Sequence, residues 1–430
     1  MIKPKRKMKP WFYLLMTFLI LIIIGSILLR LPIVSHSNHL RLIDIIFTAT
    51  SAVCVTGLTV VNTSGFNLPG QVILILLMQL GGLGIMYLSS SLVLLIKGDL
   101  NMDQRRMLNK LNDTYSLYDM GKVLSIVVLY TFIVELAGFF LLFVGFSMEG
   151  LSASESAYIS LFHAVSAFCN AGFSTFDTSI AGFNNLIKIT IMLLIVLGGI
   201  GFYVVYDLMK IIEKGYHIRV HTKVVLAATS ILIILGGIMI YFINFGHLSI
   251  IDAFFQSITA RTAGFNTVDI SSLHTVSILI LLGLMIVGAS PGSTGGGVKT
   301  TTSFVAFCSI FAILRGSKEL ILFKRKIPDI SLIRAFSIIL LYLFLIFIGT
   351  ILILLVSDVN LINALFEIPS ALGTVGLSLG TTNMLDDYGK IVIITYMFIG
   401  RVGPPALLLI MIGKEYISGI KYPEEKILLG

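Results

Sequence analysis

The feature that most restricts the fold is a mainly apolar segment that is too short to cross a membrane. It covers residues 361–372, continues into Thr374-Val375-Gly376-Leu377, and becomes polar from Gly380 onward. A membrane-spanning helix needs about 20 apolar residues. Irregular backbone inside a membrane occurs only where it is buried in protein or lines a water-filled cavity. The segment therefore predicts a re-entrant helix that enters the membrane halfway and returns.

The same pattern occurs in four copies along the chain. Each copy has a phenylalanine ten residues before a glycine, and the pairs are Phe47–Gly57, Phe162–Gly172, Phe254–Gly264 and Phe366–Gly376. Three copies have a serine six residues before the glycine, whereas the third has Ile258. Each copy lies between two long apolar segments, and such repeats indicate a repeated structural unit. We therefore predict an all-α polytopic membrane protein of four tandem M1–pore loop–M2 units, with eight transmembrane helices and four re-entrant pore helices around a pseudo-fourfold pore.

Apolar segments and polar linkers predict the unit boundaries. The chain is 57% hydrophobic and only 12% charged, a composition that excludes a soluble domain of 430 residues. The four units are expected at 11–97, 98–210, 211–315 and 316–413, between a cytoplasmic N-terminus at 1–10 and a cytoplasmic C-terminus at 414–430. The pore helices are expected at 42–55, 154–170, 251–262 and 361–372.

The positive charge follows this topology. Of the 30 Lys and Arg residues, 24 fall in the stretches expected to be cytoplasmic. Cytoplasmic loops of membrane proteins carry such an excess. The net charge of +8 therefore needs no nucleic-acid partner. It indicates a multi-pass protein of the cell membrane, surrounded by lipid, with both termini in the cytoplasm.

The turns that follow the four pore helices are the candidate ion-binding residues. Thr374-Val375-Gly376 resembles the start of the carbonyl-lined filter strand of potassium channels. The turns contain no Asp or Glu, which favours a monovalent cation held by backbone carbonyls over a calcium site. Half-helices that point inward also direct their partly negative ends at the cation. The predicted filter residues are Val55, Thr56, Gly57, Asn170, Ala171, Gly172, Thr262, Ala263, Gly264, Thr374, Val375 and Gly376.

A glycine-rich stretch interrupts one expected membrane helix and predicts a gate. Residues 288–302 contain five glycines and a proline, which a continuous helix does not tolerate. Gly288 follows Gly264 by 24 residues, as Gly400 follows Gly376, so Arg401 is expected at the same depth. An arginine at that depth is a candidate functional residue, expected to hydrogen-bond the stretch between Ala289 and Thr300. The predicted gate residues are Gly288, Ser290, Gly292, Ser293, Thr294, Gly295, Gly296, Gly297, Lys299 and Arg401.

Three further polar residues lie in apolar surroundings. Arg261 is expected to brace the third turn against Asp252 or Asp269. Glu135 is expected to be protonated, or to pair with a hydroxyl group or with Arg401. His163 is expected to be a satisfied hydrogen-bonding residue.

The fourfold pattern and the sequence of residues 289–300 resemble the TrkH/TrkG/KtrB superfamily of potassium transporters over nearly the whole chain. The KtrB branch is the closer match, because the chain begins directly with the first unit. The resemblance implies potassium uptake through one pore per subunit, a homodimeric membrane part and a cytosolic RCK-type (KtrA-like) nucleotide-binding ring. It implies K⁺ as the transported ion, in many members with dependence on Na⁺, and no covalently bound cofactor.

Two other functions remain open at this stage. One glycine in each filter strand is fewer than in tetrameric potassium channels, which leaves a less selective Na⁺/K⁺ transporter as an alternative. An alternating-access carrier also breaks helices at mid-membrane, but four units of the same orientation favour a pore. The chain has no clustered His, Asp and Glu set, so it is not expected to be an enzyme.

The charge distribution makes a testable prediction of topology. A cysteine introduced at Asn185 or Asp387 is expected to react with a membrane-impermeant thiol reagent added outside intact cells. A cysteine at Asn109 or Lys324 is expected to react only after the cells are opened. The opposite labelling pattern contradicts the topology.

Overall fold

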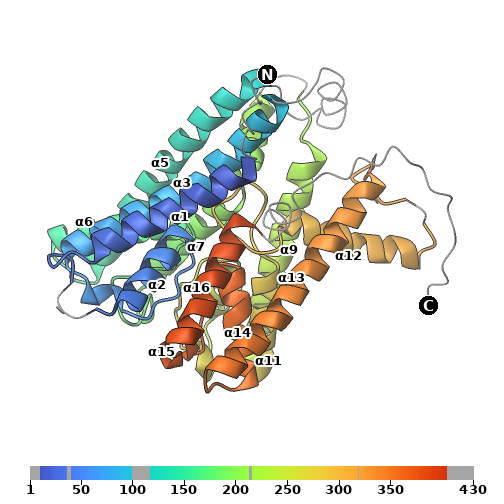
Figure 1. The fold of residues 1–430 in the computed structure, drawn as a ribbon. Coiled ribbons are helices and arrows are strands. Elements are labelled where there is room, and N and C mark those ends of the chain that lie inside the picture. The colour runs from blue at the N-terminus through green and yellow to red at the C-terminus, as the bar shows by residue number, and fades with distance from the viewer. Residues whose placement is uncertain (1–9, 36–39, 99–116, 213–215, 318, 404–430) are drawn as a thin grey trace, which may run out of the picture.

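The computed structural model describes residues 10–35, 40–98, 117–212, 216–317 and 319–403, and it is mostly helical (Figure 1). The long helices are α1 (Pro10–Leu29), α3 (Leu68–Gly98), α5 (Leu117–Met148), α9 (Val220–Ile243), α13 (Asp329–Val356) and α16 (Asp387–Val402). The short apolar helices between them are α2 (Leu42–Val53), α6 (Ala153–Phe168), α10 (Ile250–Thr259) and α14 (Leu361–Leu372). Both expected termini, and part of the linker after α3, lie outside the described residues.

The remaining elements connect these helices. Two further helical segments are each divided into a pair, α7 (Asn185–Gly199) with α8 (Phe202–Met209) and α11 (Thr275–Ile286) with α12 (Thr300–Leu314). Single turns of helix are η1 (Thr63–Gly65), η2 (Lys210–Ile212), η3 (Ile270–Ser272) and α15 (Thr381–Met384). After α12, the strands β1 (Ile321–Leu322) and β2 (Arg325–Lys326) form an antiparallel hairpin, which the all-helical prediction missed.

Length and composition identify membrane helices among the described residues. Ser125–Met148, Val220–Ile243 and Asp329–Val356 are long and apolar enough to cross a membrane, and the pair α7–α8 adds a fourth if it counts as one span. Large apolar side chains cover the outer surface of these helices, for example Phe132, Phe242 and Phe344, each about 60% exposed or more. In water such a surface would be unfavourable, so the chain is a membrane protein.

Three of the four short helices start at a side-chain cap, whereas α2 starts after Arg41 without one. Ser152 forms a capping box with Glu155 at the start of α6, and Ser249 and Asn360 cap α10 and α14 through their side-chain oxygens. The observed helices end up to three residues before the predicted ends, because the last predicted residues already form the turns. For α14 the predicted and observed bounds agree.

The returning apolar segment of the second unit is not one continuous helix. The helix breaks between α7 and α8 with a bend of 90°. Gly201, at φ +89°, adopts a backbone conformation that residues with a side chain disfavour. A Cβ at this position would lie 2.4 Å from the Pro291 carbonyl oxygen, so only glycine fits. The predicted interruption at 288–302 is present, but the helix resumes at Thr300.

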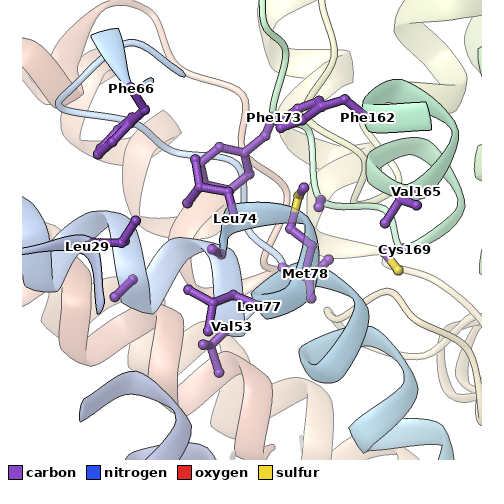
Figure 2. Packing of buried hydrophobic residues seen from close by; sticks show 14 of the residues in the cluster. Leu29, Val53, Phe66, Leu74, Leu77, Met78, Phe162, Val165, Cys169 and Phe173 are labelled. Carbon is purple, nitrogen blue, oxygen red and sulfur yellow. The ribbon is translucent and has the colours of Figure 1, made fainter. Parts of the chain in front are cut away.

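Four buried apolar clusters join successive parts of the chain. The first packs α1, α2 and α3 against α6, where Leu77 lies beside Val53 and Met78 lies on the side of Val165 and Cys169 (Figure 2). The second joins α5, α6 and α7 to α10, and the third joins α9, α10 and α11 to α14. The fourth joins α13, α14 and α16 back to α2. The order is therefore closed, because the last helices pack on the first.

Two ion pairs with little solvent exposure repeat this order at the ends of short helices. Lys188 of α7 pairs with Asp252 in the first turn of α10, with 2.7 Å between Nζ and Oδ1. Lys390 of α16 pairs in the same way with Asp44 in the first turn of α2, also at 2.7 Å. The first pair therefore links α7 to the short helix of the next copy, and the second links α16 to the short helix of the first copy.

Glycines allow the long helices to contact the ends of the short ones. A Cβ on Gly81 would overlap the Val53 carbonyl at the end of α2. Gly198 and Gly400 lie in the same way against the last residues of α6 and α14, Phe168 and Leu372. Three copies thus share one close helix contact.

Replacing Gly81 with alanine tests this contact. We expect Gly81→Ala to lower the free energy of unfolding by about 1–3 kcal/mol, because a methyl group is forced against backbone. Gly84→Ala is the matched control on the same helix, since a Cβ there meets nothing within 4 Å. Thermal unfolding of the purified protein in detergent measures both. Equal unfolding temperatures for the two variants contradict the contact.

Candidate functional site

The four glycines of the repeated turns lie in a closed ring. A Cβ added to Gly57 would lie 2.6 Å from the Ala171 carbonyl oxygen, and one added to Gly172 would lie 2.6 Å from that of Ala263. A Cβ on Gly264 would lie 2.7 Å from the Val375 carbonyl oxygen, and one on Gly376 would overlap that of Thr56. Each copy therefore contacts the next, and the fourth contacts the first. The ring has room for backbone only.

Each turn begins with a residue in a left-handed backbone conformation. Val55, Asn170, Thr262 and Thr374 have φ between 49° and 79°. Such values are strained for the three β-branched residues, at about 1–3 kcal/mol each, whereas asparagine tolerates them better. The glycine two residues later also has a positive φ in every copy. The recurrence of this turn, strained in three copies, indicates a functional site, since strain of this kind persists where function requires it.

Hydrogen bonds from the short helices hold the turns. The Thr56, Ala171 and Val375 amides donate to carbonyls five residues earlier, at 2.7–2.8 Å. The Ser51 and Ser370 hydroxyls accept from the Gly57 and Gly376 amides, and Ser166 donates to the Phe173 carbonyl at 2.8 Å. These three serines are the residues that lie six positions before the glycine in the sequence repeat.

The third copy replaces this serine with a neighbour. Thr259, and not the residue at position 258, donates to the Phe265 carbonyl at 2.8 Å. The Ala263 amide donates to the carbonyl four residues earlier instead of five. The turn is thus tighter by one residue, and a search at a fixed offset from the glycine misses the hydroxyl.

A polar cavity of about 320 Å³ opens on one side of the ring, and we call it the vestibule. All four ring glycines line it, together with Asp177, Asn266 and Asn383. Asp177 accepts hydrogen bonds from Asn62 at 3.0 Å and Ser64 at 2.6 Å. Water-sized molecules therefore reach the ring glycines from this side.

The glycine-rich residues 287–299, which we call the loop, lie against residues that precede the ring glycines in the turns. A Cβ on Gly295 would collide with the Thr262 hydroxyl, and one on Gly296 would lie 2.6 Å from the Gly373 carbonyl oxygen. The Thr294 hydroxyl donates within 3.2 Å of the Phe168 and Gly198 carbonyls. The loop therefore lies against the ends of the short helices, and side chains at its glycines would not fit.

The loop is also attached to the break between α7 and α8. The Phe202 amide donates to the Gly292 carbonyl at 3.0 Å, and the Ser290 amide donates to the Gly199 carbonyl at 3.1 Å. Lys299 donates to the Gly295 carbonyl at 2.7 Å. The sequence Gly198-Gly199-Ile200-Gly201 is the signal from which this break could have been predicted.

Arg401 connects the loop to the first copy. Its Nη1 donates to the Thr294 carbonyl, and its Nη2 donates to the Gly81 carbonyl at 2.7 Å. The side chain is buried, with 3% exposure. The expected contact between Arg401 and the loop is therefore present, and α3 supplies the second partner.

The predicted partners of two other buried residues are wrong. Arg261 does not face Asp252 or Asp269, because Asp252 pairs with Lys188 and Asp269 caps η3; its guanidinium lies 3.5 Å from the Thr229 hydroxyl. Among the residues that the structure describes, Glu135 pairs with neither a hydroxyl group nor Arg401. It accepts from the Gln79 amide at 3.1 Å.

Two buried residues of the short helices lie beside the turns. His163 is a satisfied hydrogen-bonding residue, as expected, with partners on both ring nitrogens. Glu367 of α14 is fully buried and accepts from Ser378 and Thr382. Glu367 was not predicted as a site residue, because the residues around it in 361–372 are mostly apolar and its partners lie beyond the ring glycine.

A known protein family matches nearly the whole sequence of the chain. The family model described as TrkH, cation transport protein, matches residues 3–415. The chain belongs to this family. The crystal structure of the potassium transporter TrkH from Vibrio parahaemolyticus superposes with a TM-score of 0.75 at 18% identity, covering 95% of this chain and 86% of that one. The TrkH structure thus supports the fold.

Relatives of known name match at higher identity. The Ktr system potassium uptake protein B of Vibrio alginolyticus is 35% identical, over 97% of this chain and 94% of its own length. The protein of the same name from Bacillus subtilis is 34% identical, over 96% and 95%. The potassium/sodium uptake protein NtpJ of Enterococcus hirae is 32% identical, over 99% and 98%. These TrkH-family relatives are named as transport proteins, which fits a function other than catalysis.

Proposed function

We propose that the chain takes up potassium across the cell membrane through a pore formed by four M1–pore loop–M2 units. The closed ring of Gly57, Gly172, Gly264 and Gly376 carries this proposal. Backbone carbonyls of consecutive copies adjoin these glycines, and carbonyl oxygens are the groups that replace the water shell of a monovalent cation in a filter. The closed packing order from α2 through α6, α10 and α14 supports the four-unit arrangement.

The predicted filter residues favour a cation that is held by backbone oxygens and not by carboxylate side chains. The predicted filter residues are uncharged, so backbone oxygens are the ligands on offer. The turn hydroxyls of Thr56, Thr262 and Thr374 are buried and have no protein partner in the part of the chain that the structure describes. A buried hydroxyl without a partner is unfavourable, and a passing cation or its water would satisfy these three.

A less selective pore, which conducts both K⁺ and Na⁺, is the second candidate function. One glycine in each strand, together with the similarity to the potassium/sodium uptake protein of Enterococcus hirae, favours a transporter that also accepts Na⁺. An alternating-access carrier built from inverted repeats is less consistent with the ring, in which each copy contacts the next and the fourth contacts the first. Uptake of K⁺, Na⁺ and Rb⁺ into proteoliposomes, each ion alone and in competition, separates these functions.

The chain is further proposed to act as one subunit of a larger system. Relatives are named as protein B of a Ktr system, a name that implies further components. We propose a homodimer that docks a cytosolic RCK-type nucleotide-binding ring, with both termini in the cytoplasm. Purification with the products of neighbouring genes, followed by flux assays with and without nucleotides, tests this arrangement. If no such partner is co-purified and the flux does not change with nucleotides, the proposed regulatory ring is contradicted.

The proposed filter predicts the effect of side chains in the ring. Serine in place of Gly57, Gly172, Gly264 or Gly376 is expected to lower K⁺ uptake or raise the share of Na⁺. Its side chain would have to displace a neighbouring carbonyl, and the glycine φ is strained for any other residue. Gly182→Ser is the control, since its φ is also positive but a Cβ there meets nothing within 4 Å. Unchanged flux and ion preference in all four ring variants contradict the filter.

The proposed gate predicts the effect of releasing the loop. Arg401 makes two charge-assisted hydrogen bonds, and each contributes roughly 1.5–3 kcal/mol. Deletion of residues 293–296 is therefore expected to raise K⁺ flux about tenfold or more and to weaken its dependence on any regulator. Arg401→Ala is expected to act in the same direction with a smaller change. A deletion variant that assembles but no longer transports shows that the loop belongs to the conducting path.

A further inference from the structure

Two buried titratable side chains occupy the same position behind two of the four turns. His163 in α6 lies nine residues before Gly172, and Glu367 in α14 lies nine residues before Gly376. Both side chains are fully buried, and both belong to the short helices whose ends form the ring. The two copies alternate with the other two around the ring, so His163 and Glu367 serve opposite sides of it.

Each of these side chains contacts a serine two residues beyond the ring glycine. His163 Nδ1 donates to the Ile159 carbonyl at 2.8 Å, so Nε2 of the neutral ring accepts from the Ser174 hydroxyl at 3.0 Å. Glu367 Oε2 accepts from the Ser378 hydroxyl at 2.7 Å. An imidazole and a carboxylate therefore fulfil one role, as hydrogen-bond acceptors for equivalent serines.

The two serines also hydrogen-bond the backbone at the vestibule, so they connect His163 and Glu367 to it. Ser174 Oγ accepts from the Phe176 amide at 3.1 Å, and Ser378 Oγ accepts from the Gly380 amide at 3.1 Å. Both serines line the vestibule. The same motif of helix acceptor, serine and backbone amide thus holds the second and fourth strands where they leave the ring.

The first and third copies lack this motif. At the same position the first copy has Thr48, which donates to the Asp44 carbonyl of its own helix at 2.8 Å. In the third copy, whose turn is one residue tighter, the equivalent residue is Gln256, which is fully buried and whose side-chain amide has no hydrogen-bond partner in the part of the chain that the structure describes. Only alternate strands are therefore held from behind by a polar side chain at this position.

Glu367 is fully buried without a charged partner among the described residues. Among the described residues no Lys, Arg or His forms an ion pair with Glu367, whose named partners are the Ser378 and Thr382 hydroxyls. Burying a carboxyl group with hydroxyl partners alone is costly compared with an apolar residue. The cost indicates a function in positioning the strand.

We propose that His163 and Glu367 are positioning residues that set the cation selectivity of the pore through Ser174 and Ser378. This inference rests on the proposed function of the ring as a filter. Carbonyl ligands discriminate between ions by their number, position and freedom to move. Groups held by a second layer of hydrogen bonds keep that position better than free strands do. Fixing the vestibule ends of two opposite strands limits how far the ring can adapt to a smaller ion.

The test compares K⁺ and Na⁺ uptake by purified variants in proteoliposomes. Glu367→Ala, Ser378→Ala, His163→Ala and Ser174→Ala are each expected to lower the ratio of K⁺ to Na⁺ uptake about fivefold, equivalent to about 1 kcal/mol for one hydrogen bond. The double variant Glu367→Ala/Ser378→Ala is expected to match its single variants, because both remove the same link. Glu367→Gln and His163→Gln keep an acceptor oxygen and are expected to restore the ratio.

Thr48→Ala is the matched control, since it removes a hydroxyl at the same offset that reaches only its own helix. Ratios within twofold of the parent protein in the four single variants overturn the proposal, as does an additive double variant. An equal loss in Thr48→Ala also overturns it, because the effect is then general. Should Glu367→Ala fail to assemble, Ser378→Ala still decides. A parent protein that conducts no cation contradicts the proposed function itself.

Discussion

Irregular backbone inside a membrane protein has to find its hydrogen-bond partners within the protein, and this constraint governs the whole structure. The four turns and the loop leave their carbonyls and amides without a regular helix. The turns bond to their own short helices, as the Thr56 amide does to the Ser51 carbonyl, and the loop bonds partly to itself, as the Ala289 amide does to the Gly296 carbonyl. Glycines such as Gly57 and Gly288 let the neighbouring backbone approach closely. The long helices then seal this polar centre, because Gly81, Gly198 and Gly400 let them contact the ends of the short helices.

The parts of the fold that depend on local pattern could be predicted from the sequence. The half-span at 361–372 has the length and the closing glycine of a re-entrant helix, and the structure has α14 over the same residues. Residues 288–302 contain too many glycines for a helix, and the helix is interrupted there. The depth of Arg401 followed from counting residues along equivalent helices, and its contact with the loop followed from that depth.

Other features depend on partners that are far away in the sequence. The partner of Asp252 is Lys188 and not Arg261, because α7 packs on α10 and brings the lysine to the start of that helix. Thr259 replaces the expected serine since the third turn is one residue tighter. Glu367 looks out of place in an apolar segment until Ser378 and Thr382 fold back onto it. A periodic pattern cannot contain such information.

The closure of the ring has a consequence for how the protein is made. Gly376 completes the contact with Thr56, Lys390 pairs with Asp44, and Arg401 reaches Gly81. These contacts join residues more than 300 positions apart. Chains leave the ribosome from the N-terminus, so the first turn enters the bilayer long before its final neighbours exist. The growing chain must shelter an incomplete polar centre until almost its last helix is inserted, and translation that stops before residue 401 leaves that centre open to lipid.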